Sequence, residues 1–343
     1  MMFESVRKEK GVQRRQLDGA IVSRTPLRIS FVGGGTDIPE YYRTNGGGAV
    51  VNAAIDKYVY IIVNKKFDGD VRVSYSQTES VSSTDDLKHP LFRESLNLLN
   101  IRKGVEIASL ADIPSHGTGL GSSSAFTVGL LNALHAWLGE HVPPKQLAEE
   151  AVLIERDIVK EPGGRQDQYI AAYGGLQFME FYPDDKVEVL PIAMEEAKCG
   201  LLEESLLLFY TGRRRPRTPI LSGQIGEMSN HREHYDEMRQ LALDLRRELE
   251  NGRVHRLGEY LHKNWERKRS LYDAITNPNI ENLYARAREA GAIGGKITGA
   301  GGGGFLLLCV PPASRQSVRL AISELREEPF HLEKEGSKVV SLR

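Results

Sequence analysis

The chain has 343 residues, of which 40% are hydrophobic, and it contains 34 glycines but only two cysteines. At about 150 residues per domain, this length predicts two domains with a full hydrophobic core, which excludes a disordered chain, a collagen-like repeat and a small disulfide scaffold. The 45 basic and 46 acidic residues nearly cancel. A nucleic acid or a membrane is therefore not expected as a partner.

The cysteines and the N-terminal residues indicate the compartment. Cys199 and Cys309 lie far apart and outside any C-x-x-C motif, which predicts reduced thiols in the cytoplasm. Residues 1–20 are charged throughout, lack an apolar signal segment and are expected to form a flexible leader. The apolar run at 305–310 is too short to span a bilayer. We therefore expect a soluble cytoplasmic protein.

Strand and helix patterns are mixed along the rest of the chain, with turn-forming residues between them. Runs rich in β-branched and aromatic residues predict strands at 21–32, 50–55, 58–67, 71–75, 105–113, 176–182, 186–192, 205–212, 296–297, 305–310 and 338–342. Helical patterns occur at 37–45, 89–100, 125–139, 143–159, 166–173, 220–275, 277–291 and 314–327. We place a boundary near 195, which gives domains 21–195 and 196–343.

A glycine-rich loop between a strand and a long apolar helix is the first candidate phosphate site. Such a loop points successive backbone N–H groups at one anion, and the helix dipole adds to their effect. It is not a Walker A loop, since the chain has no GK[ST], and it lacks the last glycine of a G-x-S-x-G elbow. A tight turn with hydroxyl caps is the alternative interpretation. The residues of this phosphate loop are Gly117, Thr118, Gly119, Leu120, Gly121, Ser122, Ser123 and Ser124.

Two further glycine loops invite different interpretations. Gly299–Gly304 contains G-x-G-x-x-G, but a strand follows it where the dinucleotide fingerprint requires a helix. Its glycines instead suggest close approach to a ligand or to another glycine loop. Residues 33–37 end a strand with the carboxylate of Asp37, which suits hydrogen bonds to substrate hydroxyls or a helix N-cap.

The segment from Glu155 to Tyr169 holds two carboxylates around a helix break. Pro162, Gly163 and Gly164 interrupt the helix, and Asp167 then lies in the first turn of the next one. Asp167 is placed to accept a hydroxyl proton, and Glu155 to hold a metal ion. Capping and surface carboxylates are the alternative for either residue taken alone.

In this order the segments TPLRISFVGGGTD, PSHGTGLGSSSA and KITGAGGGG resemble the three signature motifs of the galactokinase–homoserine kinase–mevalonate kinase–phosphomevalonate kinase (GHMP) superfamily, over about residues 24–310. EPGGRQDQ resembles the segment that carries the catalytic aspartate in its sugar kinases. The resemblance implies an α+β fold of two domains, the first similar to ribosomal protein S5 and the second ferredoxin-like, with the active site in the cleft between them.

Within the superfamily, RTPLRISFVGGGTD and AAYGGLQFMEFY look most like the D-glycero-D-manno-heptose 7-phosphate kinases. Galactokinases have Glu-His where this chain has Gly34-Gly35, and the third serine of the phosphate loop departs from the Gly-Gly-Ser-Ser of heptose kinases. The resemblance implies ATP and Mg²⁺ as cofactors and phosphorylation of the anomeric hydroxyl, for nucleotide-activated heptose synthesis. Another sugar such as fucose, mannose or galactose, a decarboxylase of the diphosphomevalonate type, or a non-catalytic nucleotide-binding member remain alternatives. The resemblance is also compatible with a homodimer.

The resemblance also implies roles for individual residues. Asp167 and Arg28 match the catalytic pair, the phosphate loop would bind ATP, and Ser123 with Glu155 would hold the metal ion. Arg213 and Arg215, in a dense arginine cluster, are candidates for the phosphate that the acceptor already carries, or else belong to a solvated loop. The remaining candidates for acceptor binding are Asp37, Gly34, Gly35, Thr36, Gly164, Arg165, Gly301 and Gly302.

Overall fold

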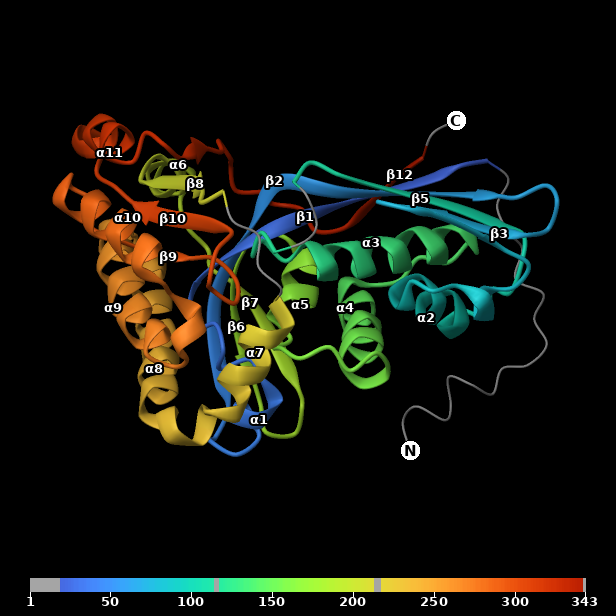
Figure 1. The fold of residues 1–343 in the computed structure, drawn as a ribbon, viewed down its shortest axis with the longest axis horizontal. Coiled ribbons are helices and arrows are strands. Elements are labelled where there is room, and N and C mark those ends of the chain that lie inside the picture. Colours follow the sequence, from blue (N-terminus) through green and yellow to red (C-terminus); the bar gives the residue numbers. More distant parts are fainter. Residues whose placement is uncertain (1–18, 114–116, 213–216, 342–343) are drawn as a thin grey trace.

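The computed structural model describes residues 19–113, 117–212 and 217–341, and its strands form two sheets (Figure 1). The larger sheet has the order β12-β1-β2-β5-β3-β4, and in addition β6 pairs with β2 and β7 pairs with β6. The smaller sheet has the order β11-β8-β10-β9. The strands are β1 (Ile21–Val32), β2 (Gly48–Lys65), β3 (Val71–Ser74), β4 (Thr78–Val81), β5 (Val105–Ala111), β6 (Leu176–Phe181), β7 (Val187–Pro191), β8 (Leu206–Tyr210), β9 (Gly294–Ile297), β10 (Phe305–Cys309), β11 (Arg326–Glu327) and β12 (Lys338–Ser341).

The helices flank these sheets and follow the predicted order. Elements that the sequence patterns did not predict are the strands β4 and β11 and the helix α6, all of them short. The helices are α1 (Pro39–Tyr42), α2 (Pro90–Leu98), α3 (Ser122–Trp137), α4 (Pro144–Val152), α5 (Gln166–Tyr173), α6 (Glu196–Glu204), α7 (Arg217–Gly226), α8 (Arg232–Glu250), α9 (Leu257–Arg269), α10 (Pro278–Glu289) and α11 (Arg315–Ala321).

Strand β2 is continuous where two strands, 50–55 and 58–67, were expected. A register shift against β1 separates the pair Leu27–Ile55 from the pair Pro26–Tyr58. This bulge accommodates the polar residues 56 and 57 without ending the strand. The first half of β2 can therefore pair with β6 and the second half with β5.

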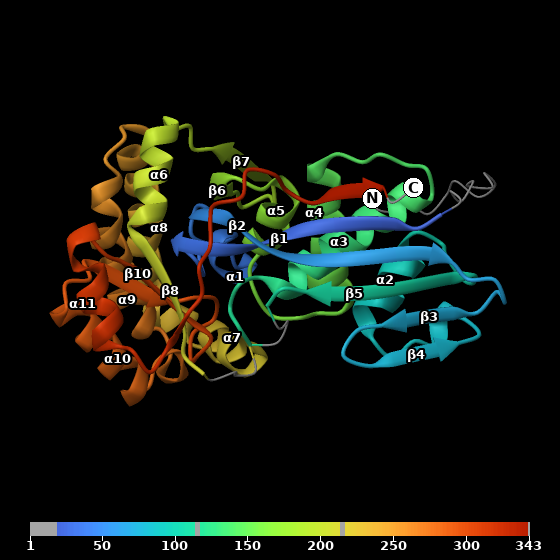
Figure 2. The ribbon, with the colours of Figure 1, turned by 90° about the horizontal axis from the view of Figure 1, so that it is seen from above.

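Helix α3 lies against the middle of the large sheet and is buried on nearly all sides, as its apolar sequence predicts (Figure 2). The hydroxyl of Ser23 on β1 donates to the carbonyl oxygen of Gly129 at 2.7 Å. A Cβ at Gly129 would lie 2.6 Å from Thr25 Oγ1, so the close approach of helix and strand requires glycine. This packing of α3 on β1 fixes the position of the N-terminus of α3, where the phosphate loop ends.

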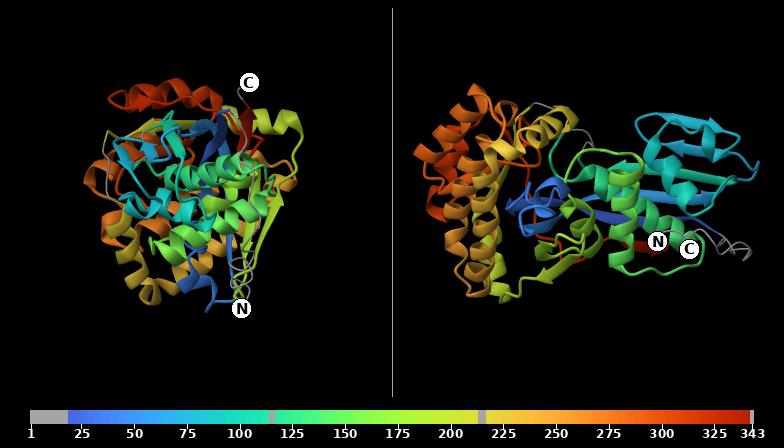
Figure 3. Two further views of the ribbon diagram at one scale, coloured as in Figure 1. Left: turned by 90° about the vertical axis from the view of Figure 1, so that its right-hand side faces the viewer. Right: turned by 90° about the horizontal axis from the view of Figure 1, so that it is seen from below.

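The second half of the chain packs its helices around the smaller sheet, but its last strand returns to the first half (Figures 1 and 3). Strand β12 pairs with β1, and Glu333 N donates to Ala54 O on the way there. Within the expected domain 196–343, the strands up to β11 belong to the smaller sheet, whereas β12 belongs to the larger one. Within the part of the chain that the structure describes, no helix is long and apolar enough to span a bilayer.

The helix expected at 143–159 changes its winding before it ends. It is α-helical to Val152 and continues as a π-helical turn, Leu153–Ile158. Such turns are rare and are often found at functional sites, because the extra residue rotates the side chains that follow it. Here the turn carries Glu155, whose side chain is completely buried.

The ends of α3 and α4 are joined through one buried histidine. His135 Nδ1 lies 2.7 Å from Glu140 Oε2, and its Nε2 lies 2.8 Å from Glu150 Oε2. Burial by itself lowers the pKa of His135, but the hydrogen bonds and charges of Glu150 and Glu140 outweigh it, so the pKa is raised above 6.5. The protonated imidazole can donate to both carboxylates.

This arrangement predicts a pH-dependent contribution to stability. Because the pKa of His135 is raised on folding, the contribution is full below pH 6.5 and is lost as the pH rises through the raised value. Urea unfolding of the wild type should therefore lose more free energy between pH 6.5 and 9 than unfolding of His135→Gln. Parallel pH profiles for the two proteins would contradict this account of His135.

Candidate functional site

The phosphate loop has the backbone geometry that anion binding needs. Gly117, Gly119 and Gly121 all have positive φ, at 72°, 77° and 77°, and they alternate with residues of ordinary conformation. Gly121 is the N-cap of α3 and offers no side-chain cap to the first N–H groups of the helix. These groups have no partner within the helix. The loop therefore presents backbone N–H groups and the positive end of α3 to one place.

The C-terminal glycine loop lies directly on the phosphate loop, as its sequence suggested. A Cβ on Gly119 would lie 2.4 Å from Thr298 O, and one on Gly299 would lie 2.6 Å from the Cα of Gly119. A Cβ on Gly304 would lie 2.5 Å from Thr118 O. Real Cβ atoms do not approach so closely, so these glycines allow the two backbones to touch. The two halves of the chain meet at this contact.

A buried ion pair stands beside the phosphate loop. Arg28 on β1 donates from Nε and Nη2 to the two carboxylate oxygens of Asp167 on α5, both at 2.8 Å. Its Nη1 donates to Gly119 O at 2.6 Å, and its backbone N donates to Leu120 O at 2.9 Å. Both charged side chains are about 5% exposed. The bidentate geometry holds Asp167 in a single orientation next to the loop.

Asp37 lies across the pocket from this pair and is held by backbone N–H groups. Its Oδ1 accepts from Gly35 N at 2.8 Å, and its Oδ2 accepts from Gln166 N, in the first turn of α5, at 3.1 Å. A Cβ on Gly164 would lie 1.8 Å from Oδ2. Asp37 thus holds the first turn of the distant helix α5 and lines the pocket, whereas the N-cap of the helix α1 that follows it is Ile38.

Glu155 reaches the first turn of α3 from the π-helical turn. Its Oε2 accepts from Ser124 Oγ at 2.9 Å and from Gln168 Nε2 at 2.8 Å. Arg156 Nη2 lies 3.5 Å from the same oxygen. The serine that contacts Glu155 is therefore Ser124, whereas Ser123 was expected from the sequence. Ser123 is half-buried.

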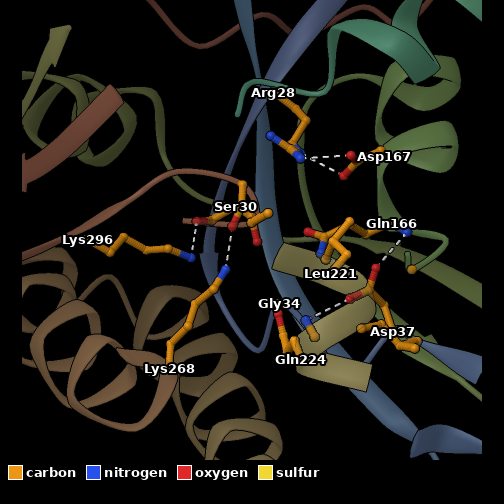
Figure 4. Close-up of a pocket in the computed structure, with 15 residues that line it drawn as sticks. Arg28, Ser30, Gly34, Asp37, Gln166, Asp167, Leu221, Gln224, Lys268 and Lys296 are labelled. Carbon is orange, nitrogen blue, oxygen red and sulfur yellow. Dashed lines mark hydrogen bonds and ion pairs between the residues drawn. The ribbon is translucent and has the colours of Figure 1, made fainter. Parts of the chain in front are cut away.

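Arg28, Asp167 and Asp37 line one pocket between the two halves of the chain, whereas the phosphate loop and Glu155 are not among its lining residues (Figure 4). The first half supplies β1, the turn that ends at Asp37 and the start of α5, and the second half supplies α7, α9, β9 and the C-terminal loop. The lining residues are Arg28, Ser30, Gly34, Gly35, Asp37, Ile38, Gly164, Gln166, Asp167, Leu221, Gln224, Lys268, Lys296, Gly299 and Ala300.

Several expected acceptor-binding residues do not line this pocket. Thr36 Oγ1 donates to Gly33 O and Ala49 O, so its hydroxyl stabilises the turn. Arg165 points to Asp185, with Nη2 3.4 Å from Oδ1, and its guanidinium lies over the ring of Tyr42.

The C-terminal loop also contributes other residues than expected. Gly302 N donates to Ile275 O at 2.7 Å, and a Cβ on Gly301 would contact the same residue. These two glycines pack on the turn at 273–275, while Gly299 and Ala300 face the pocket. Arg213 and Arg215 lie outside the described residues.

Two buried lysines in the pocket were not predicted. Lys296 is 1% exposed, and its Nζ donates to Ser30 O at 2.8 Å and Phe31 O at 3.2 Å. Lys268 is 5% exposed and donates to Gly299 O. Lys296 is the first residue of the motif KITGAGGGG, so the sequence could have indicated it as a site residue. Lys268 lies in the charged run WERKR, which in sequence looks like a solvated helix face.

Comparisons with known proteins identify the family of this chain. The family model of the GHMP kinase N-terminal domain matches residues 88–175, and that of the GHMP kinase C-terminal domain matches residues 245–328. A D-glycero-alpha-D-manno-heptose 7-phosphate kinase of Campylobacter jejuni is 31% identical, over 93% of this chain and 98% of its own. An L-fucokinase/L-fucose-1-P guanylyltransferase of Bacteroides fragilis is 28% identical over 91% of this chain but only 37% of its own.

Solved structures show the same architecture. A structure titled D-glycero-D-manno-heptose 1-phosphate kinase, from Bacteroides thetaiotaomicron, superposes with a TM-score of 0.78 at 26% identity and covers 94% of this chain and 99% of its own. The galactokinase of Lactococcus lactis superposes at 0.72 with 19% identity, over 94% and 95% of the two chains. The family models and the identity to the Campylobacter enzyme show that this chain belongs to the GHMP kinase family.

Proposed function

We propose that this protein is an ATP-dependent sugar kinase that phosphorylates the anomeric hydroxyl of D-glycero-D-manno-heptose 7-phosphate. The observation that carries the proposal is the Arg28–Asp167 pair, buried where the phosphate loop meets the pocket. The similarity to the heptose phosphate kinases of Campylobacter jejuni and Bacteroides thetaiotaomicron supports a heptose phosphate as the acceptor.

The phosphate loop is the proposed site for the ATP phosphates. Backbone N–H groups between Gly117 and Ser124, together with the N-terminus of α3, supply a positive field without using a lysine. The contacts of Gly119 and Gly304 with the C-terminal loop hold this backbone in shape. A rigid cradle of this kind favours the binding of phosphate beside the loop at little entropic cost.

The residues around Glu155 fit a Mg²⁺ ion bound together with a nucleotide. Mg²⁺ in such sites takes one or two carboxylates, and phosphate oxygens and waters complete its shell. Glu155 is a buried carboxylate hydrogen-bonded to Ser124, in the helix turn that begins the proposed phosphate site. We propose that Glu155 holds the ion with a hydroxyl of Ser123 or Ser124. When bound, Mg²⁺ would neutralise charge on the phosphates.

Asp167 and Arg28 are the proposed catalytic residues. Phosphoryl transfer needs an oriented acceptor and stabilised charge more than a strong base. Asp167 is held by two hydrogen bonds to Arg28, and it lines the pocket, so it can accept a hydrogen bond from the acceptor hydroxyl and take its proton during transfer. Arg28 adds a fixed positive charge beside the transferred group.

The other side of the pocket is suited to sugar hydroxyls. Asp37 accepts hydrogen bonds from two backbone N–H groups and retains further acceptor capacity. Gln166 Oε1 is buried without a hydrogen-bond partner among the described residues, although Gln166 lines the pocket. Both groups would accept hydrogen bonds from a polyhydroxylated acceptor, which favours a sugar over mevalonate.

The proposal predicts ADP release with Mg-ATP in the presence of D-glycero-D-manno-heptose 7-phosphate, and much less with mannose, fucose, galactose or mevalonate. Asp167→Asn should lower kcat with the best acceptor by about 100-fold or more, because it removes a charged acceptor of the hydroxyl proton. Turnover only with an unphosphorylated sugar, for example fucose, would replace the heptose assignment. Wild-type turnover in Asp167→Asn would rule out its catalytic role.

Removal of the Glu155 carboxylate should affect the metal requirement. Glu155→Gln is expected to raise the Mg²⁺ concentration for half-maximal activity by about 10-fold or more, since a neutral amide is a poor ligand for a hard cation. Asp157→Asn, at an exposed position of the same turn, is the matched control. Equal metal requirements of the two variants would argue against Glu155 as a ligand.

The close contact at Gly164 gives a test of Asp37. Gly164→Ala places a methyl group against the Asp37 carboxylate, which must move. We expect the KM for the acceptor to rise by about 10-fold or more while the KM for ATP changes little, because hydrogen bonds to a charged group are lost. Gly200→Ala, where a Cβ meets nothing within 4 Å, is the control. An unchanged acceptor KM in Gly164→Ala would show that Asp37 does not bind the acceptor.

A further inference from the structure

Two lysines of the C-terminal half reach the same end of the pocket (Figure 4). Lys296 comes from β9 and donates to the backbone at Ser30, and Lys268 comes from the last turn of α9 and donates to Gly299 O. The ammonium of Lys296 is bound to two carbonyl oxygens, and it forms no ion pair with a carboxylate of the described residues. Buried lysines are rare because a buried cation loses its hydration.

The charges around Lys296 favour an anion at this end. Burial, Lys268 and Arg28 all lower the pKa of Lys296, well below its usual value, and Asp37 is the group that acts in the opposite direction. Arg28 is bound to Asp167, whereas Lys296 is bound to two carbonyl oxygens. An anion beside Lys296 would offset the repulsion that Lys268 and Arg28 exert on its ammonium.

Ser30 supplies a second, independent sign of a ligand. Its Oγ is buried and has no hydrogen-bond partner among the residues that the structure describes. The atom lies 3.1 Å from the position that a Cβ on Gly34 would take, and both residues line the pocket. A buried hydroxyl normally finds a partner, so a ligand that accepts its hydrogen bond is expected here.

The place of Ser30 on β1 decides which anion fits. Arg28 is level with the phosphate loop, because its backbone N donates to Leu120 O. Ser30 lies two residues further along the strand, roughly 6–7 Å away, toward the turn that carries Asp37. Lys296, bound to Ser30 O and Phe31 O, therefore lies toward the acceptor side of the pocket, whereas Lys268 is bound to Gly299 O of the C-terminal loop.

We propose that Lys268, Lys296 and Ser30 form an anion subsite for a phosphate group that the sugar acceptor carries before the reaction. This assignment rests on the proposed kinase function and adds the feature that distinguishes a phosphosugar from a free sugar. It places the phosphate in the buried pocket itself, whereas the sequence led us to expect it at Arg213 and Arg215, which lie outside the described residues.

The test compares Lys268→Met with the wild type on two acceptors, D-glycero-D-manno-heptose 7-phosphate and the same heptose without phosphate. The preference for the phosphorylated acceptor, as a ratio of kcat/KM, should fall by about 10-fold or more. Ser30→Ala should lower it by a smaller factor. Lys263→Met, at an exposed position of α9, should leave the preference unchanged.

Equal losses on both acceptors in Lys268→Met, with the preference unchanged, would overturn the subsite and indicate a contact with the transferred phosphoryl group. Calorimetric binding of the two heptoses without ATP separates this inference from the proposed function. If no sugar is turned over, the kinase proposal fails, but tighter binding of the phosphorylated heptose that Lys268→Met abolishes would still support the subsite. Equal or absent binding of the two heptoses to the wild type would refute it.

Discussion

The site depends on the buried contacts of Arg28. One guanidinium binds both carboxylate oxygens of Asp167 and the carbonyl of Gly119, so it links β1, α5 and the phosphate loop. A buried ion pair is weak evidence for stability, because the loss of hydration can exceed the attraction between the charges. Here the pair serves placement: it orients a carboxylate at the junction of the phosphate loop and the acceptor pocket, and leaves both charges away from bulk water.

Around this pair, glycines determine how closely the two halves of the chain approach. Gly119 has positive φ for the phosphate loop and also lacks the Cβ that would strike Thr298. Gly299 in turn lacks the Cβ that would strike Gly119. The phosphate loop is consequently held in shape by the C-terminal half. The same glycines thus give the phosphate loop its backbone conformation and allow the two halves of the chain to touch.

The pocket has opposite polarity on its two sides. Asp37 and Gln166 present acceptors from the N-terminal half, whereas Lys268 and Lys296 present donors from the C-terminal half (Figure 4). The pair of Arg28 and Asp167 stands next to both. Such a pocket suits a molecule with hydroxyl groups along one side and an anionic group on the other, and it requires both halves of the chain for recognition.

The sequence by itself determined what depends on neighbours along the chain: the strand at 21–32, the glycine loops, and Asp167 at the start of a helix, because periodicity and turn chemistry are local. Only the tertiary structure decided what depends on distant contacts. The hydroxyl of Thr36 and the guanidinium of Arg165 are bound outside the pocket. Lys268 resembles a solvated charge in sequence but is buried. The return of β12 to β1 likewise follows from strand pairing, which a local pattern does not encode.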